Sequence, residues 1–68
     1  MSISIRNRLL GAIEKIVSDK VVSEFVIRTA AGTVTSIITT GSVKRMNLKK
    51  GDNVLAVMKA TAVSVEKE

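Results

Sequence analysis

The sequence predicts an all-β fold, namely a small OB-like closed barrel of five strands with one short helical turn. Three observations point to this class. Segments rich in β-branched residues recur along the chain, short turn-forming segments separate them, and 68 residues suffice for only one domain. Because an open sheet would leave unpaired edges, we expect either closure of the barrel or exchange of strands between subunits.

The first half of the chain predicts two long strands joined by a turn. One strand covers residues 3 to about 17, with Gly11 as the expected bend or bulge, and the other covers residues 21–29. Residues 18–20, Ser-Asp-Lys, form the turn between them. Residues 30–33 close the next hairpin, where Gly32 supplies the positive φ that a tight connection needs.

The second half predicts shorter strands and one helical segment. The β-branched residues that fill positions 34–40 favour a third strand and argue against a helix there. Residues 42–48 form one or two helical turns, with Ser42 as the N-cap. A turn at residues 49–52 leads to a fourth strand at residues 53–58 and a fifth at residues 61–65.

The composition favours a homo-oligomer. The chain is 46% hydrophobic and contains neither Cys nor His, so no disulfide and no structural zinc site can stabilise so small a fold. Association of subunits is the remaining device, and it would cover apolar surface that one small barrel leaves exposed. We therefore expect an obligate homo-oligomer.

Hydropathy and charge indicate the cellular location of the protein and the kind of partner that it binds. The apolar runs are far shorter than the ~20 residues that span a bilayer, and the N-terminus has no signal-peptide core. We therefore expect a cytoplasmic protein with no membrane partner. A formal net charge of +5 favours anionic partners.

A nucleic-acid-binding barrel is the alternative function. The one dense basic cluster could contact phosphates, and it consists of Lys44, Arg45, Lys49 and Lys50. Single-strand binders also stack bases on aromatic side chains, however, and Phe25 is the only aromatic residue of the chain. This shortage makes nucleic acid the weaker of the two hypotheses.

Hydrogen-bond donors gather on one face of the opening segment. Strand alternation gives that face two hydroxyls and two guanidinium groups, from Ser2, Ser4, Arg6 and Arg8. Several donors with fixed positive charge and no carboxylate are suited to bind an oxyanion. The alternative is an ordinary solvated strand face. Asn7 falls on the apolar side, where its amide needs partners.

Two further places add donors of the same kind. Lys59 follows the fourth strand, on the same face as Leu55 and Val57, and Ala60 and Thr61 come directly after it. Hydroxyl side chains also surround the predicted start of the helical segment, at Thr39, Thr40 and Ser42. The alternatives are a lysine that marks the end of a strand and a capped turn without a ligand.

These three segments resemble the molbindins, the small Mop-domain molybdate-binding proteins. The opening motif of that family, Ile-Ser-Ala-Arg-Asn followed by Leu and Gly, is matched by residues 3–11. Its Thr-Ser-Ile-Ile-Ser or Thr segment leading to Ser-Val is matched by residues 35–43. Its final Gly, strand and Lys-Ala or Lys-Ser with Thr are matched by Gly51 and residues 57–63. The likeness covers nearly the whole chain.

The resemblance implies a single Mop domain over residues 1–68. Its subunits would exchange strands into dimers, and three dimers would form a hexamer. Molybdate or tungstate would bind between subunits, where Ser4 and Arg6 of one chain meet Thr39, Ser42, Lys59 and Ala60 of another. The family has a small residue where this chain has Ile5, whose larger side chain would crowd the anion. The implied oxyanion-binding residues are Ser4, Ile5, Arg6, Asn7, Thr39, Ser42, Lys59, Ala60 and Thr61.

Neither catalysis nor a cofactor is predicted. The chain has no His or Cys, and its six acidic residues are scattered over turns, polar strand faces and the tail. A tetrahedral dianion needs donors rather than metal ligands from the protein, so no metal is expected except within the bound oxyanion. Storage or homeostasis of molybdate is favoured over signalling, because no DNA-binding or ATPase domain accompanies the Mop domain in this chain.

Overall fold

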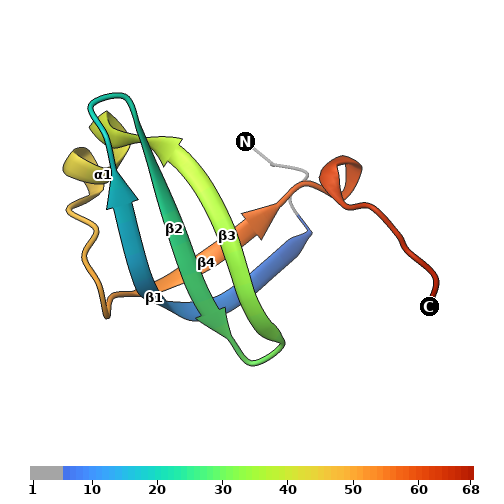
Figure 1. The fold of residues 1–68 in the computed structure, drawn as a ribbon. Helices are drawn as coiled ribbons and strands as arrows, with labels where there is room; N and C mark the ends of the chain where they lie inside the picture. Colours follow the sequence, from blue (N-terminus) through green and yellow to red (C-terminus); the bar gives the residue numbers. More distant parts are fainter. Residues whose placement is uncertain (1–5) are drawn as a thin grey trace.

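The computed structural model describes residues 6–68, so the predicted beginning of the first strand lies outside the described part. Figure 1 shows one curled sheet that wraps into a half-barrel. Its strand order is β3-β2-β1-β4, with antiparallel neighbours throughout. The elements are β1 (Asn7–Ser18), β2 (Val22–Thr29), β3 (Gly32–Thr39), α1 (Thr40–Met46), β4 (Asn53–Met58) and the 3-10 turn η1 (Ala60–Ala62).

Strand β1 is long because it serves two neighbours. Its first half pairs with β4, from Asn7 opposite Met58 to Ala12 opposite Asn53, and its second half pairs with β2. The predicted bulge is not at Gly11, where the register stays regular. It lies at Glu14, between Ile13 and Lys15, and the Glu14 carboxylate forms an ion pair with Arg28.

Gly11 has a different role from the one predicted. It pairs with β2 on one side and with β4 on the other. A Cβ at this position would collide with the carbonyl oxygen of Arg28 and would lie 2.8 Å from Cγ2 of Ile27. Gly11 therefore allows a close approach of backbones, which is a common reason for glycine inside a strand.

The helix begins earlier than predicted. Thr39, rather than Ser42, is the N-cap, and its Oγ1 accepts a hydrogen bond from the backbone N–H of Ser42 at 3.1 Å. Thr40 and Ser42 also carry hydroxyl groups and lie in the first turn of α1. The sequence alone therefore does not show which of the three residues caps the helix. Asn47 ends the helix in the left-handed conformation, at φ 53°.

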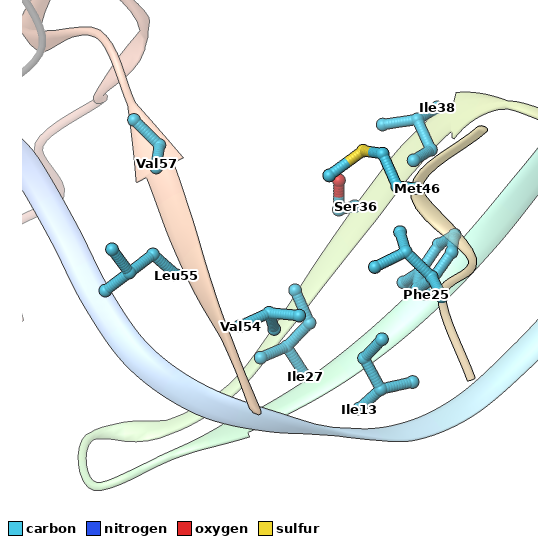
Figure 2. Close-up of a pocket in the computed structure, with 10 residues that line it drawn as sticks. Ile13, Phe25, Ile27, Ser36, Ile38, Met46, Val54, Leu55 and Val57 are labelled. Atoms are coloured by element: carbon cyan, nitrogen blue, oxygen red, sulfur yellow. The ribbon is translucent and has the colours of Figure 1, made fainter. Parts of the chain in front are cut away.

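The core lies on the concave side of the sheet. Its buried residues are Ile13, Phe25, Ile27 and Ala56, and Leu9, Val34 and Val43 are among those packed against them. An open apolar cavity of about 260 Å³ continues this core between β4 and the β2–β3 hairpin (Figure 2).

The predicted closed barrel and fifth strand are not found in the described chain. Residues 60–62 form η1, residues 63–68 have no regular structure, and Val65 is 95% exposed. β3 and β4 have one neighbour each among the described residues, so the sheet remains open between them. A strand is stabilised by pairing with another strand, and residues 61–65 have no such neighbour here.

Candidate functional site

Pairing of β1 with β4 brings the first group of predicted residues together. Because Asn7 lies opposite Met58, the segment that begins with Arg6 runs beside the one that continues into Lys59. Arg6 and Lys59 are both exposed, whereas Asn7 is half-buried. A cavity of about 370 Å³ lies at this end, lined by Arg6, Asn7, Arg8, Leu9, Met58 and Val63.

The turn η1 fixes the backbone after Lys59. The N–H of Ala62 donates to the carbonyl of Lys59 at 2.9 Å, and that of Val63 donates to the carbonyl of Ala60 at 3.3 Å. Within residues 6–68, the Lys59 ammonium and the Thr61 hydroxyl have no hydrogen-bond partner. We call Arg6, Asn7, Lys59, Ala60 and Thr61 the strand-end cluster.

A second group of predicted residues surrounds the beginning of α1. The Thr39 hydroxyl donates to Oγ of Ser42 at 2.8 Å. The same oxygen accepts a bond from Nη2 of Arg45 at 3.0 Å. Arg45 was assigned only to the basic cluster by sequence, although its i,i+3 spacing from Ser42 on a helix could have indicated the contact. We call Thr39, Ser42 and Arg45 the helix-start cluster.

A chain of hydroxyl groups anchors the helix-start cluster to the rest of the sheet. Ser23, whose side chain is 0% exposed, contacts the Ser18 hydroxyl at 2.7 Å and the Thr40 hydroxyl at 2.9 Å. Thr40 Oγ1 then donates to the carbonyl oxygen of Asp19 at 2.8 Å. These hydroxyl contacts were not predicted from the sequence, because they depend on the pairing of Ser18 with Ser23 and on the position of Thr40 beside them.

Within one chain the two clusters stay apart. Figure 1 shows α1 at one end of the sheet, whereas the start of β1, the end of β4 and η1 lie at the opposite side. Lys59 and Ala60 therefore accompany Arg6, rather than Thr39 and Ser42, in the single chain. Ser4 and Ile5 lie outside the described residues.

Other sites are less suited to an anionic ligand. The cavity of Figure 2 is lined by apolar side chains except for Ser36, and an unpaired charge would be strongly unfavourable there. Phe25 is only 3% exposed, so it cannot stack on a base. Residues 6–68 contain no group of three potential metal ligands among His, Cys, Asp and Glu. In the same described part, no helix is long and apolar enough to span a membrane.

Comparison with known proteins finds relatives along nearly the whole chain. The TOBE domain family matches residues 3–65. Molybdenum-pterin-binding proteins 2 and 1 from Clostridium pasteurianum are 39% and 38% identical over 66 residues, covering 96% of this chain and 97% of each relative. MopII from the same organism superposes with a TM-score of 0.89 at 37% identity, covering 97% of this chain and 100% of MopII.

A second solved structure extends this likeness. A molybdate binding protein from Sporomusa ovata superposes with a TM-score of 0.91 at 36% identity, covering 98% of this chain and 100% of that protein. The matched residues 3–65 include both clusters. The resemblance to Mop proteins that the three sequence motifs indicated is thereby confirmed. The chain belongs to the TOBE domain family.

Proposed function

We propose that this protein binds molybdate, or the similar tungstate, as a tetrahedral oxyanion. The observation that carries the proposal is the pair of donor-rich clusters at the two ends of the sheet, within a fold whose relatives are named for binding molybdate or molybdenum-pterin. The strand-end cluster offers a guanidinium, an ammonium and a hydroxyl group. None of the nine predicted site residues is acidic. Such a set suits a dianion.

The site is completed between subunits. One chain separates its strand-end cluster from its helix-start cluster, so a ligand that contacts both must lie between two chains. Exposed aliphatic side chains provide a reason for such association: Leu10 is 71% exposed and Ile37 is 64% exposed. The assembly that we propose is a hexamer of three strand-exchanged dimers, each chain forming one Mop domain over residues 1–68.

The biological role in this proposal is storage or homeostasis of the anion in the cytoplasm. The relatives are named as binding proteins. Neither cluster pairs a nucleophile with a general base, which fits binding without catalysis. The only metal would be the one inside the oxyanion, so no cofactor is involved.

Calorimetric titration tests the function directly. The protein is titrated with molybdate, tungstate, sulfate and a short single-stranded oligonucleotide under identical ionic strength. We expect saturable binding of molybdate and tungstate. Binding should be lost when dilution separates the oligomer into single chains, because each site is formed between two chains. Binding of the oligonucleotide alone would instead support the basic cluster as the functional surface.

A further inference from the structure

Arg8 shares one face of the sheet with the two cations of the strand-end cluster. Met58 packs against the core, so Val57 before it and Lys59 after it face the opposite, outer side of the sheet. Arg8 is exposed and lies directly opposite Val57 in the pairing of β1 with β4. Arg6 lies two residues before Arg8, and strand alternation places it on the same side.

The three cations are close enough to contact one small ligand. The register that places Asn7 opposite Met58 places Arg6 opposite Lys59 when it is continued by one residue. Opposite residues of an antiparallel pair have Cβ atoms about 4.5 to 5.5 Å apart, and diagonal neighbours such as Arg8 and Lys59 are about 7 to 8 Å apart. Both arginines also line the cavity of about 370 Å³ at this end of the sheet.

No carboxylate neutralises Arg8. Within residues 6–68 its guanidinium makes no hydrogen bond and no ion pair. Residues 1–5 contain no acidic residue that could pair with it. Like charges at facing positions of two strands repel one another. An anion bound among these cations removes that repulsion in addition to accepting hydrogen bonds from them.

We infer that Arg8 is a further anion-binding residue of the strand-end cluster and that it favours divalent over monovalent tetrahedral oxyanions. This inference rests on the proposed function. The family resemblance implies roles for Arg6 and Lys59 but none for Arg8. A third positive charge raises the potential at the site, and its Coulomb energy with a ligand is proportional to the charge of that ligand. A divalent anion therefore gains twice as much from Arg8 as a monovalent anion of the same shape.

Tungstate and perrhenate form a matched pair of probes, because both are tetrahedral and nearly equal in size, whereas tungstate is divalent and perrhenate is monovalent. Lys15 provides the matched control residue. It is exposed on the same strand as Arg8, but it lies in the half of β1 that pairs with β2. Arg8→Gln and Lys15→Gln each remove one positive charge from β1, and only Arg8→Gln removes it from the strand-end cluster.

The experiment measures the affinities of the full-length chain and its variants for tungstate and perrhenate at constant ionic strength. We expect the unsubstituted protein to prefer tungstate. Arg8→Gln should lower the tungstate affinity at least about tenfold and the perrhenate affinity by only about threefold, because the lost energy is halved for the monovalent anion. Lys15→Gln should change both affinities little. Equal losses for the two anions in Arg8→Gln, or the same loss of preference in Lys15→Gln, would overturn the inference.

Arg8→Lys tests whether the charge of this residue is what matters. Lysine keeps the positive charge but not the guanidinium, so this variant should retain the preference for tungstate over perrhenate. A preference as low in Arg8→Lys as in Arg8→Gln would contradict selection by charge. Failure of the unsubstituted protein to bind tungstate or molybdate would refute the proposed function, whereas normal binding with no effect of Arg8→Gln would refute this inference alone.

Discussion

Gly11 is the residue at which the smallest change should have a large effect on stability. An alanine Cβ would contact the carbonyl of Arg28, which is backbone and cannot move aside easily. Overpacking of this kind typically costs about 1 to 3 kcal/mol. We expect Gly11→Ala to lower the free energy of unfolding by about that amount in a urea titration.

Gly41→Ala is the matched control for Gly11→Ala. Gly41 lies in the first turn of α1, and a Cβ there would meet no atom within 4 Å. Alanine reduces the freedom of the unfolded chain, so this substitution should leave stability unchanged or raise it by about 0.4 to 1 kcal/mol. Equal losses at the two glycines would show that the close approach at Gly11 is unimportant.

Asp19 should make stability depend on pH in acid. The backbone N–H groups of Val22 and then Val21 donate to its carboxylate, at 2.8 and 2.7 Å, and lower the pKa of Asp19 below its ordinary value. A group whose pKa is lower in the folded state stabilises it above the ordinary pKa of about 3.9, and this contribution disappears as the pH falls through the folded-state pKa.

Asp19→Asn isolates this effect, because an amide oxygen can accept the same two bonds without titrating. Melting temperatures of both proteins would be measured from neutral pH down to about pH 3. The advantage of the unsubstituted protein should be constant at neutral and weakly acidic pH and should shrink in stronger acid. An advantage that grows on acidification would contradict the assignment.

At the scale of elements, the sequence pattern predicted those strands and turns whose conformation depends mainly on neighbouring residues. The β-branched residues in 34–39 lie in β3 and Gly32 has φ 118°, as predicted, whereas Thr40, the last residue of the predicted strand, already belongs to α1. The bulge was predicted at Gly11 from its residue type. Its actual position at Glu14 depends on how β1 pairs with β2, which residue type does not show. The strand at residues 61–65 was predicted from its side chains, although a strand also requires a neighbour.

Ser23 should be the main link between the β1–β2 turn and α1. Its buried hydroxyl contacts Ser18 and Thr40, and removing it leaves those partners with fewer bonds. We expect Ser23→Ala to lower the free energy of unfolding by about 1 to 3 kcal/mol. Ser18 is exposed, so Ser18→Ala should cost less because water can replace its hydroxyl. Equal effects measured by urea unfolding would argue against Ser23 as the link.

At the scale of the whole molecule, the sequence indicated the kind of site better than its layout. Donor types and spacing singled out Arg6, Thr39 and Lys59, but alternation within one segment cannot tell which segments meet. That depends on the register of β1 with β4, which brings Arg6 to Lys59 and leaves Thr39 at the far end. Arg45 was not singled out from the sequence, because its bond to Ser42 at 3.0 Å depends on the helix that α1 forms from Thr40 onward.

The same layout leads us to expect assembly of several chains. The open apolar cavity, the two sheet edges and the exposed Leu10, Ile37 and Val65 leave much apolar surface uncovered on one chain. We expect sedimentation at micromolar concentration to give a multimer, with a hexamer as the proposed species. A stable folded monomer that still binds molybdate would contradict a site shared between chains.

The positive charges of the strand-end cluster should matter far more for binding than equal charges elsewhere. A dianion held away from water requires compensating charge at close range, and loss of one charged partner typically costs about 2 to 5 kcal/mol. We expect Arg6→Ala or Lys59→Ala to lower molybdate affinity at least about tenfold while the oligomer survives. Lys49→Ala and Lys50→Ala should change it little, because both side chains are exposed in the loop before β4 and are screened by salt. Calorimetric titration of the four variants decides the matter, since equal losses would mean that a general positive field, rather than a specific site, attracts the anion.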